Sequence, residues 1–520
     1  MIVSVRLILL SCILTLSFFA FKIPTSDFDI VKITGGTISG TVNKEGDIHI
    51  FKGIPFAAAP VGDLRWKAPQ PPKLWAGVKD CTVFGASPVQ AVPLPFSMWT
   101  KEFLIPDEPI NEDCLYLNIW TGAKVPKEKK PVIVWIYGGG FSSGGAGAPI
   151  YDGEAMAKKG IVFVSFNYRV GIFGFFAHPE LTKESGKNAS GNYGLMDQVA
   201  ALQWIKNNIA QFGGDPANVC IAGQSAGSMS VNCMVASPLT KNLFQKAIAE
   251  SGASFLSSPL REITGLAAAE KEGVKTAAAL KANSVAALRT MSAAILLKTP
   301  QNIRGPIVDG YVLPKSITDI FAEKKENPVA LLTGWNQDEG LIFGPVKNAD
   351  GFTKEAADQY GADASSFLKY YPANNDSIAA VSQLNLSRDI IFGVQNYTWA
   401  NIQSNHGSKV YVYRFTRKVP ATGEYIKYGA FHTGEVPYAY DNLQFVNRPW
   451  KAVDYELAKT MSAYWVNFAT NGNPNGSGLP NWPAYNTTNK MIMKLSENPS
   501  AKKIWDAESL DFLYGKMGGK

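Results

Sequence analysis

Hydrophobic and polar positions follow two different periods along the chain. Residues 132–136 and 161–164 are continuously apolar, as expected for parallel strands buried on both faces. Residues 115–119 alternate between apolar and polar, which predicts a strand exposed on one face. In residues 195–212 the apolar positions recur every three or four, which predicts a helix that ends at Gly213. Strands that alternate with helices predict an α/β fold with a mainly parallel sheet.

The remaining pattern extends this prediction to the C-terminus. Residues 85–113 contain five prolines and little periodicity, so we expect a long loop that forms a lid or a wall of a site. Neither a repeat nor a linker divides the chain. Further predicted elements are short hairpins at 31–56, strands at 218–222, 329–333 and 410–415, mostly helical segments at 262–299 and 353–404, and a long helix near 451–470.

The first residues have the pattern of a secretory signal peptide. Arg6 precedes the apolar run 7–21. We therefore predict a signal peptide at 1–22 and a single domain at 23–520, exported to the periplasm or the medium. An uncleaved N-terminal anchor is the alternative. No later segment has 18 uncharged apolar residues, so we expect no membrane span in the mature chain.

Composition narrows the class of function. The net charge of +7 is spread along 520 residues, and Glu128 interrupts the densest basic cluster at 127–130, which argues against nucleic-acid binding. The sequence has no cluster of histidine and cysteine with the spacing of metal ligands, so we expect no metal and no organic cofactor. After export, an oxidising compartment would permit a disulfide between Cys81 and Cys114. The sequence predicts no particular oligomeric state.

The sharpest chemical signal is the run Gly223-Gln224-Ser225-Ala226-Gly227. G-x-S-x-G alone is a weak pattern, but here an apolar strand precedes it and a helix-forming segment follows. That context predicts a sharp strand–turn–helix connection that exposes the hydroxyl of Ser225 as a nucleophile. The flanking glycines suit such a turn because a Cβ at either position would crowd it.

A serine hydroxyl needs a base to remove its proton. In α/β folds with this type of serine turn, the acid and the histidine follow the serine in the chain. Two histidines qualify, His406 and His432, and the glycines that flank His432 favour it. The acid is expected after a strand that ends at the ligand-binding edge of the sheet. Asp338 and Glu339 both stand there, and the residues alone do not separate them.

A glycine triplet, Gly138–Gly140, follows the apolar run that ends at Ile136. Consecutive glycines let backbone N–H groups point at a ligand without obstruction. The amides of Gly139, Gly140 and Ala226 are therefore candidates for an oxyanion hole.

Together these segments resemble the type-B carboxylesterases over residues from about 51 to beyond 485. The resemblance implies the α/β-hydrolase fold and a triad of Ser225, Glu339 and His432. It also implies Gly139, Gly140 and Ala226 as the oxyanion hole and Ser251 as a buried support of the triad. The spelling is most similar to exported bacterial para-nitrobenzyl-esterase-like members. Motifs that carry the resemblance are Phe51–Ala57 (FKGIPFA), Glu112–Asn118 (EDCLYLN), Asn167–Arg169 (NYR) and Gly191–Gln198 (GNYGLMDQ).

Two departures from the family pattern bear on function. Gln224 stands beside the nucleophile where many members carry Glu, which favours neutral esters with small to medium acyl groups over cationic ones. The family's early disulfide would join Cys114 to a cysteine near Pro88, which is missing here. The expected partner is thus a small-molecule ester, cleaved through an acyl-enzyme. The alternatives are a true lipase with a lid around Phe96–Phe103 and a non-catalytic binding protein similar to neuroligins.

Overall fold

The computed structural model describes residue 28 and residues 30–107, 109–258, 262–300, 302, 305–342 and 344–519. The predicted signal peptide at 1–22 lies outside these residues. Within them, eleven strands form one large sheet in the order β14-β13-β12-β11-β10-β9-β7-β8-β6-β4-β3. The chain first makes a small sheet of β1 (Val31–Ile33), β2 (Gly36–Ser39) and β5 (Val78–Asp80).

The centre of the large sheet is parallel from β8 across to β13, and its two edges are antiparallel. The strands are β3 (Thr41–Val42), β4 (His49–Pro55), β6 (Tyr116–Thr121), β7 (Lys130–Ile136), β8 (Val162–Phe166), β9 (Gly214–Gln224), β10 (Lys246–Glu250), β11 (Ala330–Asn336), β12 (Val410–Phe415), β13 (Met491–Leu495) and β14 (Ser500–Lys503).

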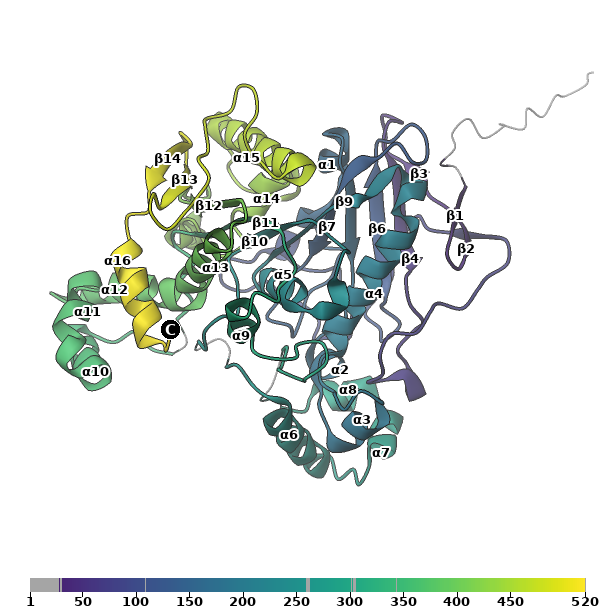
Figure 1. Cartoon of the computed structure of the whole chain (residues 1–520), viewed down its shortest axis with the longest axis horizontal. Coiled ribbons are helices and arrows are strands. Elements are labelled where there is room, and N and C mark those ends of the chain that lie inside the picture. Colours follow the sequence, from purple (N-terminus) through teal and green to yellow (C-terminus); the bar gives the residue numbers. More distant parts are fainter. Residues whose placement is uncertain are drawn as a thin grey trace, which may run out of the picture.

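Helices cover both faces of this sheet. Figure 1 shows α4, α5 and α13 on one side and α1, α14 and α15 grouped on the other. Peripheral helices extend the chain beyond the sheet. The principal helices are α1 (Glu154–Lys158), α4 (Tyr193–Asn208), α5 (Ala226–Ala236), α13 (Val394–Asn405), α14 (Val436–Ala439) and α15 (Ala452–Asn471). The peripheral ones are α2 (Gly171–Phe175), α3 (Pro179–Glu184), α6 (Leu266–Ala279), α7 (Val285–Thr290), α8 (Ala293–Leu297), α9 (Ile317–Ala322), α10 (Ala349–Tyr360), α11 (Ala364–Tyr370), α12 (Asp376–Arg388) and α16 (Ala507–Lys516).

The hydrophobic pattern predicts most of these elements. The hairpins, the long loop, the buried strands β7 and β8 and the helices α4 and α15 all lie where we expected them. The expectation of a half-exposed strand at 115–119 is wrong, because residues 117–121 of β6 are all buried. Asn118, on the face that the alternation predicts to be exposed, bonds instead to Ser165 inside the protein, and the neighbouring Thr121 bonds to the Phe212 carbonyl.

The elements that were not predicted include the strands β5, β10, β13 and β14 and the helices α1, α2, α3, α9, α14 and α16. Strand β10 is only five residues long, and its buried terminal residues Lys246 and Glu250 hide the hydrophobic signal. The proposed disulfide is also absent, since Cys81 and Cys114 are separate buried thiols. Cys114 lies against the Arg169–Asp197 ion pair, and burial raises the pKa of Cys81 to about 11. In the described part of the chain, no helix has the length and hydrophobicity to cross a bilayer.

Candidate active site

The G-x-S-x-G run forms the connection between β9 and α5. Ser225 stands between them with φ 59° and ψ −124°, a conformation that non-glycine residues rarely adopt. Its amide donates to the Glu250 carbonyl at 2.9 Å. The strain is retained because both flanking elements are buried and fix the backbone on either side.

Contacts with the neighbouring strand explain the two glycines. A Cβ on Gly227 would lie 2.0 Å from the Ile136 carbonyl oxygen, and one on Gly223 would lie 2.7 Å from the same atom. Both approaches are closer than atoms tolerate, so the turn needs glycine at each position. The glycines are therefore needed to avoid a clash with the end of β7 as well as crowding within the turn itself.

The glycine triplet follows β7 and lies against this turn. A Cβ on Gly138 would lie 2.7 Å from the Gln224 carbonyl oxygen, so the missing side chain lets the two segments approach. Gly139 has φ +112° and Gly140 has φ +61°. Within the part of the chain that the structure describes, the amides of Gly139, Gly140 and Ala226 donate to no other backbone carbonyl. They remain available to a ligand.

His432 lies in the loop between β12 and α14, and its partner is Glu339. The distance from His432 Nδ1 to Glu339 Oε2 is 2.8 Å. The imidazole is 3% exposed and the glutamate 0%. The amide of Asn336, at the end of β11, donates to the second carboxylate oxygen of Glu339 at 2.7 Å. A carboxylate at Nδ1 orients the ring and favours its protonated form.

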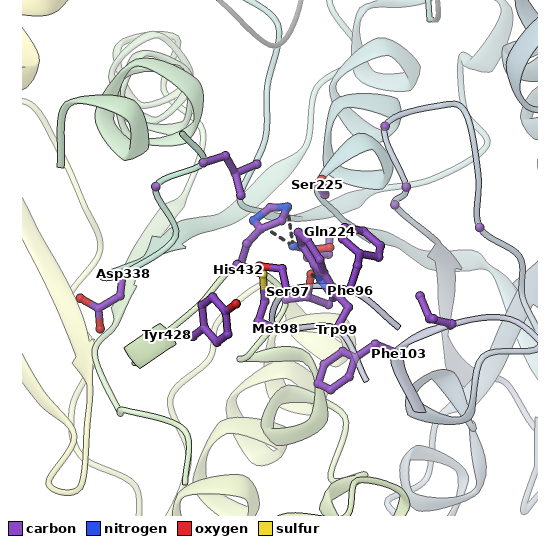
Figure 2. Close-up of a pocket in the computed structure, with 18 of the residues that line it drawn as sticks. Phe96, Ser97, Met98, Trp99, Phe103, Gln224, Ser225, Asp338, Tyr428 and His432 are labelled. Atoms are coloured by element: carbon purple, nitrogen blue, oxygen red, sulfur yellow. Dashed lines mark hydrogen bonds between the residues drawn. The ribbon is translucent and has the colours of Figure 1, made fainter. Parts of the chain in front are cut away.

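Asp338 has a different role from its neighbour. Its side chain is exposed and turns away from His432 (Figure 2). Its Oδ2 accepts from the Ala430 amide at 2.8 Å, and its own amide donates to the Ala430 carbonyl at 3.0 Å. Asp338 thereby fastens the histidine loop to the end of β11 without touching the imidazole.

Gln224 faces the imidazole from the other side. Its Nε2 lies 3.4 Å from His432 Nδ1 and 3.3 Å from Nε2 (Figure 2). Among the described residues, no hydrogen bond joins Ser225 Oγ to His432. Such bonds are often long or poorly aligned without substrate. The side chain that sequence reasoning placed beside the nucleophile is therefore also a direct neighbour of the base.

Two aromatic rings enclose the imidazole. Phe392 stacks on it, with ring centroids 4.4 Å apart and an interplanar angle of 19°. Trp99 meets it edge-on at 6.3 Å and donates its indole N–H to Thr433 Oγ1 at 3.2 Å. Trp99 comes from the long loop 85–113, so that loop is a wall of the site as expected. Phe392 carries no sequence signal, because it follows α12 in an irregular helical segment.

Two further buried acids are Glu250 and Glu435, and Glu435 lies close to both Glu250 and Glu339. Burial raises the pKa of Glu250 to about 7, although Tyr440 and Trp465 donate to its Oε1. Burial, reinforced by the charges of Glu250 and Glu339, raises the pKa of Glu435 well above its ordinary range. Two glutamates packed together without a cation cannot both be charged at low cost. Glu435 stands three residues after His432, and nothing in the sequence indicates that it lies close to Glu339 and Glu250.

Ser251 and His406 complete the comparison with the sequence predictions. Ser251 follows Glu250 and is fully buried with φ 54°, but its hydroxyl makes no recorded bond to His432 or Glu339. His406 lies at the end of α13, where its Nδ1 is 2.5 Å from Glu326 Oε1. It is a partly buried, paired residue, which corrects the interpretation as a solvated loop residue and removes it from the site.

A cavity of about 890 Å³ opens over these groups. Ser225, His432 and the glycine triplet line it. Phe96, Met98, Trp99 and Phe103 of the long loop line it as well (Figure 2). The charged residues among its described lining are Asp338, Lys418 and Lys427. Nowhere in the described ranges does a group of three or more His, Cys, Asp or Glu residues form a metal site. The arrangement offers a hydroxyl, an imidazole and free amides at one end of an apolar cavity.

Comparisons with known proteins agree with this arrangement. Residues 27–513 match the model of the "Carboxylesterase family". The chain is 38% identical to "Fumonisin B1 esterase" of Sphingopyxis macrogoltabida over 481 residues, covering 88% of this chain and 85% of that protein. It is 34% identical to "Para-nitrobenzyl esterase" of Bacillus subtilis (strain 168), covering 94% and 99%. A solved structure of PNB esterase superimposes with a TM-score of 0.80 at 31% identity, covering 93% of this chain and 99% of that one. These matches confirm the predicted α/β-hydrolase fold.

Proposed function

The chain belongs to the carboxylesterase family, whose members are serine ester hydrolases, and we propose that Ser225, His432 and Glu339 carry out its reaction. The observation that carries this assignment is the 2.8 Å contact between His432 Nδ1 and Glu339 Oε2 beside a strained serine turn. A strained nucleophile turn and an oriented imidazole, both open to one cavity, are what acyl transfer requires.

In the proposed mechanism, Ser225 Oγ attacks the ester carbonyl carbon while His432 Nε2 takes its proton. Substrate in the cavity replaces the contact between Gln224 and Nε2, so that the imidazole can face the serine. Glu339 stabilises the imidazolium. The amides of Gly139, Gly140 and Ala226 bind the oxyanion of the tetrahedral intermediate.

The intermediate then collapses. The bond to the alcohol oxygen breaks, and His432 gives its proton to the leaving alcohol. A water molecule, deprotonated by His432, then attacks the acyl carbon. The bond between that carbon and Ser225 Oγ breaks, His432 returns the proton to Oγ, and the carboxylic acid leaves. Each proton taken by the imidazole is thus returned within the cycle. Gln224 and Ser251 are proposed to support the triad without themselves making or breaking bonds.

The proposed substrates are neutral carboxylic esters with small to medium acyl groups. Gln224 places no charge beside the acyl-enzyme, and the cavity lining holds two lysines and one aspartate, so nothing there selects a cation. The cavity volume of 890 Å³ is in the range of sites for small organic ligands. The relative named for fumonisin B1 makes that ester a natural member of a substrate panel.

The test combines labelling with a substrate panel. A fluorophosphonate should modify the chain once, on the peptide that contains Ser225, and abolish hydrolysis in proportion. Nitrophenyl esters of increasing acyl length, together with fumonisin B1, should then define the acyl preference. A label on another serine, or hydrolysis that persists after complete labelling, would contradict the assignment.

Export and a single domain at 23–520 complete the proposal. The pattern of residues 1–22 supports a cleaved signal peptide. N-terminal sequencing of the protein recovered from the periplasm or the medium should begin close to residue 23. Recovery of a chain that retains residue 1 in a membrane fraction would favour the uncleaved anchor.

A further inference from the structure

Two buried arginines donate hydrogen bonds to the loop that carries Glu339. Arg388, at the end of α12, donates from Nη1 to the Gln337 carbonyl at 3.0 Å. Arg414, on β12, donates from Nη1 to the Gln337 side-chain oxygen at 3.2 Å. Gln337 stands two residues before Glu339, so both arginines act on the same short loop from different elements.

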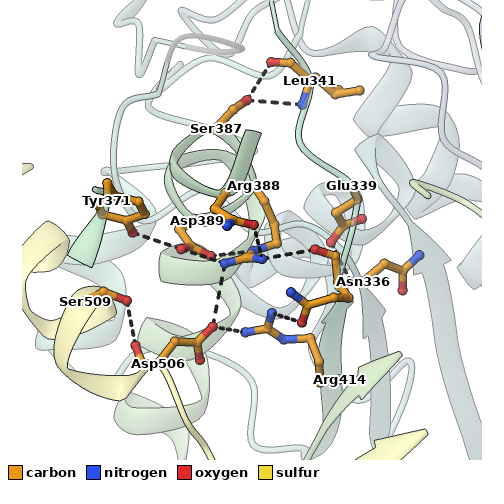
Figure 3. A network of polar contacts seen from close by, with 12 residues as sticks. Asn336, Glu339, Leu341, Tyr371, Ser387, Arg388, Asp389, Arg414, Asp506 and Ser509 are labelled. Atoms are coloured by element: carbon orange, nitrogen blue, oxygen red, sulfur yellow. Dashed lines mark hydrogen bonds and ion pairs between the residues drawn. The ribbon is translucent and has the colours of Figure 1, made fainter. Parts of the chain in front are cut away.

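These arginines belong to a four-residue cluster, Arg388, Asp389, Arg414 and Asp506, which we term the rear ion network (Figure 3). Arg388 binds Asp389 in bidentate fashion, at 2.7 and 2.9 Å. Arg414 pairs with Asp506, which also lies 3.7 Å from Arg388. The network holds two positive and two negative charges, so its members neutralise one another.

Asp506 is the part of the network that reaches in from the C-terminal segment. It directly precedes α16, and the Ser509 hydroxyl donates to its carbonyl at 2.9 Å. Arg414 is 0% exposed, and its guanidinium carbon lies 4.5 Å from the centroid of the Trp335 ring and 5.1 Å from that of the Trp505 ring. A buried guanidinium needs a carboxylate partner, and Asp506 is the one that Arg414 contacts among the described residues.

The same network reaches the base through a second route. Asp389 begins a π-helix, Asp389–Gly393, between α12 and α13, and the Tyr371 hydroxyl donates to its Oδ2 at 2.9 Å. One turn later, Phe392 stacks on His432. Short π-helical segments are frequent at functional sites because they aim a side chain that a regular helix would misplace.

We propose that the rear ion network is a positioning device for the Glu339–His432 pair, completed by Asp506 from the C-terminal segment. It acts on Glu339 through Gln337 and on His432 through Phe392, and it touches neither substrate nor the reacting atoms. The inference rests on the proposed function, in which Glu339 and His432 are the acid and the base. Its members are therefore positioning residues and not catalytic residues.

The primary test is Asp506→Asn, which keeps the size of the side chain and removes its charge. We expect kcat for a nitrophenyl ester to fall about tenfold with KM within about twofold. A looser Glu339 stabilises the imidazolium less, so the acid limb of the kcat/KM profile should also move to lower pH. The other titratable groups near the pair are Glu250, Glu435 and Tyr413.

The matched control is Asp511→Asn in α16, the helix that Asp506 precedes; Asp511 pairs with Lys490 at 2.9 Å and is about half exposed. It removes the same charge without contacting the network, so kcat and the pH profile should not change. Phosphonate titration counts the competent sites in every sample. If the loss in Asp506→Asn equals the loss of titratable sites, with an unchanged pH profile, the role is structural only and the proposal is wrong.

Gln337→Ala keeps the test decisive if Asp506→Asn does not fold. It leaves all four charges in place and removes the acceptor of Arg414, so kcat should fall about threefold with the same direction of pH shift. Wild-type kcat and an unchanged profile in Gln337→Ala would overturn the proposal. Glu339→Gln separates this outcome from a failure of the proposed function: if Glu339→Gln is inactive while both network variants behave as wild type, only the positioning inference fails.

Discussion

The two sides of the proposed active site are held in different ways. The nucleophile side, Gly138–Gly140 and Gly223–Gly227, is fixed by backbone contacts between β7 and β9, where an added Cβ would collide with a carbonyl. The acid–base side, residues 336–341 and 429–435, consists of loops held by side-chain hydrogen bonds and ions. The first arrangement depends on the backbones of neighbouring strands in one sheet, and the second on side chains that reach the loops from separate elements.

This difference explains what the sequence could predict. The nucleophile side consists of two short glycine-containing segments, each at the end of an apolar strand. Hydrophobic periodicity and the motifs together therefore locate it in the sequence. On the acid–base side the residues alone left Asp338 and Glu339 open, because the choice depends on which carboxylate faces His432. Only the fold places Asp338 against Ala430 and leaves Glu339 for the imidazole.

The same reasoning applies to the rest of the molecule. The central strands were predictable because burial on both faces leaves a continuous apolar run. Strand β10 was not, because Glu250 and Lys246 end it with buried charges. The rear ion network and Phe392 were also missed, since contacts between residues so far apart in the chain leave no local period. Polar groups that are satisfied inside the protein look like surface residues in the sequence.

Removing the nucleophile should have the largest effect on turnover. Ser225→Ala should lower kcat by about 10⁴-fold or more, because activated attack is lost while the oxyanion amides remain. The fold should be unchanged, since alanine is smaller and the turn is set by its flanking glycines. Steady-state assays on a nitrophenyl ester measure the loss of kcat, and a melting curve checks that the fold is unchanged. Turnover near the wild-type rate would show that the reaction uses another residue.

The next largest effect should separate the two neighbouring acids. Glu339→Gln should lower kcat by about 10³-fold, through loss of imidazole orientation and charge stabilisation. Asp338→Asn should cost less than about fivefold, because the asparagine oxygen can still accept from the Ala430 amide. Steady-state kinetics on one ester suffices for both. Equal losses, or the reverse order, would mean that the acid had been assigned one residue out of place.

Buried acids should make the acid–base side sensitive to pH in its folding stability. The pKa of Glu250 is raised from 4.5 to about 7 by burial, so the folded state holds a proton that the unfolded state has lost. The stabilisation is complete below about pH 4.5 and is lost as pH rises to about 7. Urea midpoints should therefore fall between pH 5 and pH 8.

Glu250→Gln should make that decline smaller, because glutamine keeps the acceptor for Tyr440 and Trp465 but binds no proton. The exposed Glu456→Gln is the control and should leave the decline as it is in the wild type. A decline of equal size in Glu250→Gln would show that the pH dependence arises elsewhere in the molecule.

The smallest expected effect concerns Gln224, the residue at which the two sides meet. It ends β9 on the nucleophile side, and its amide contacts the imidazole of the acid–base side. A carboxylate at this position would favour a cationic alcohol in the low-dielectric cavity, whereas the amide has the same shape without charge. We expect the wild type to prefer a neutral thioester over butyrylthiocholine of matched acyl length by at least about tenfold in kcat/KM. That ratio needs only about 1.4 kcal/mol of differential transition-state binding.

Gln224→Glu should move this ratio toward the choline ester by about tenfold, since the new charge lies beside the acyl-enzyme. The ratio of two substrates on one enzyme cancels any general loss of activity, including one caused by a carboxylate next to His432. Asn385→Asp, which adds a charge at another residue lining the cavity, is the control and should change the ratio less. An equal shift in both variants would mean that total charge in the cavity sets the preference, and no shift in either would mean that its shape does. A wild type that already prefers the choline ester would remove the basis for assigning neutral substrates, because Gln224 would then select a cation without any charge of its own.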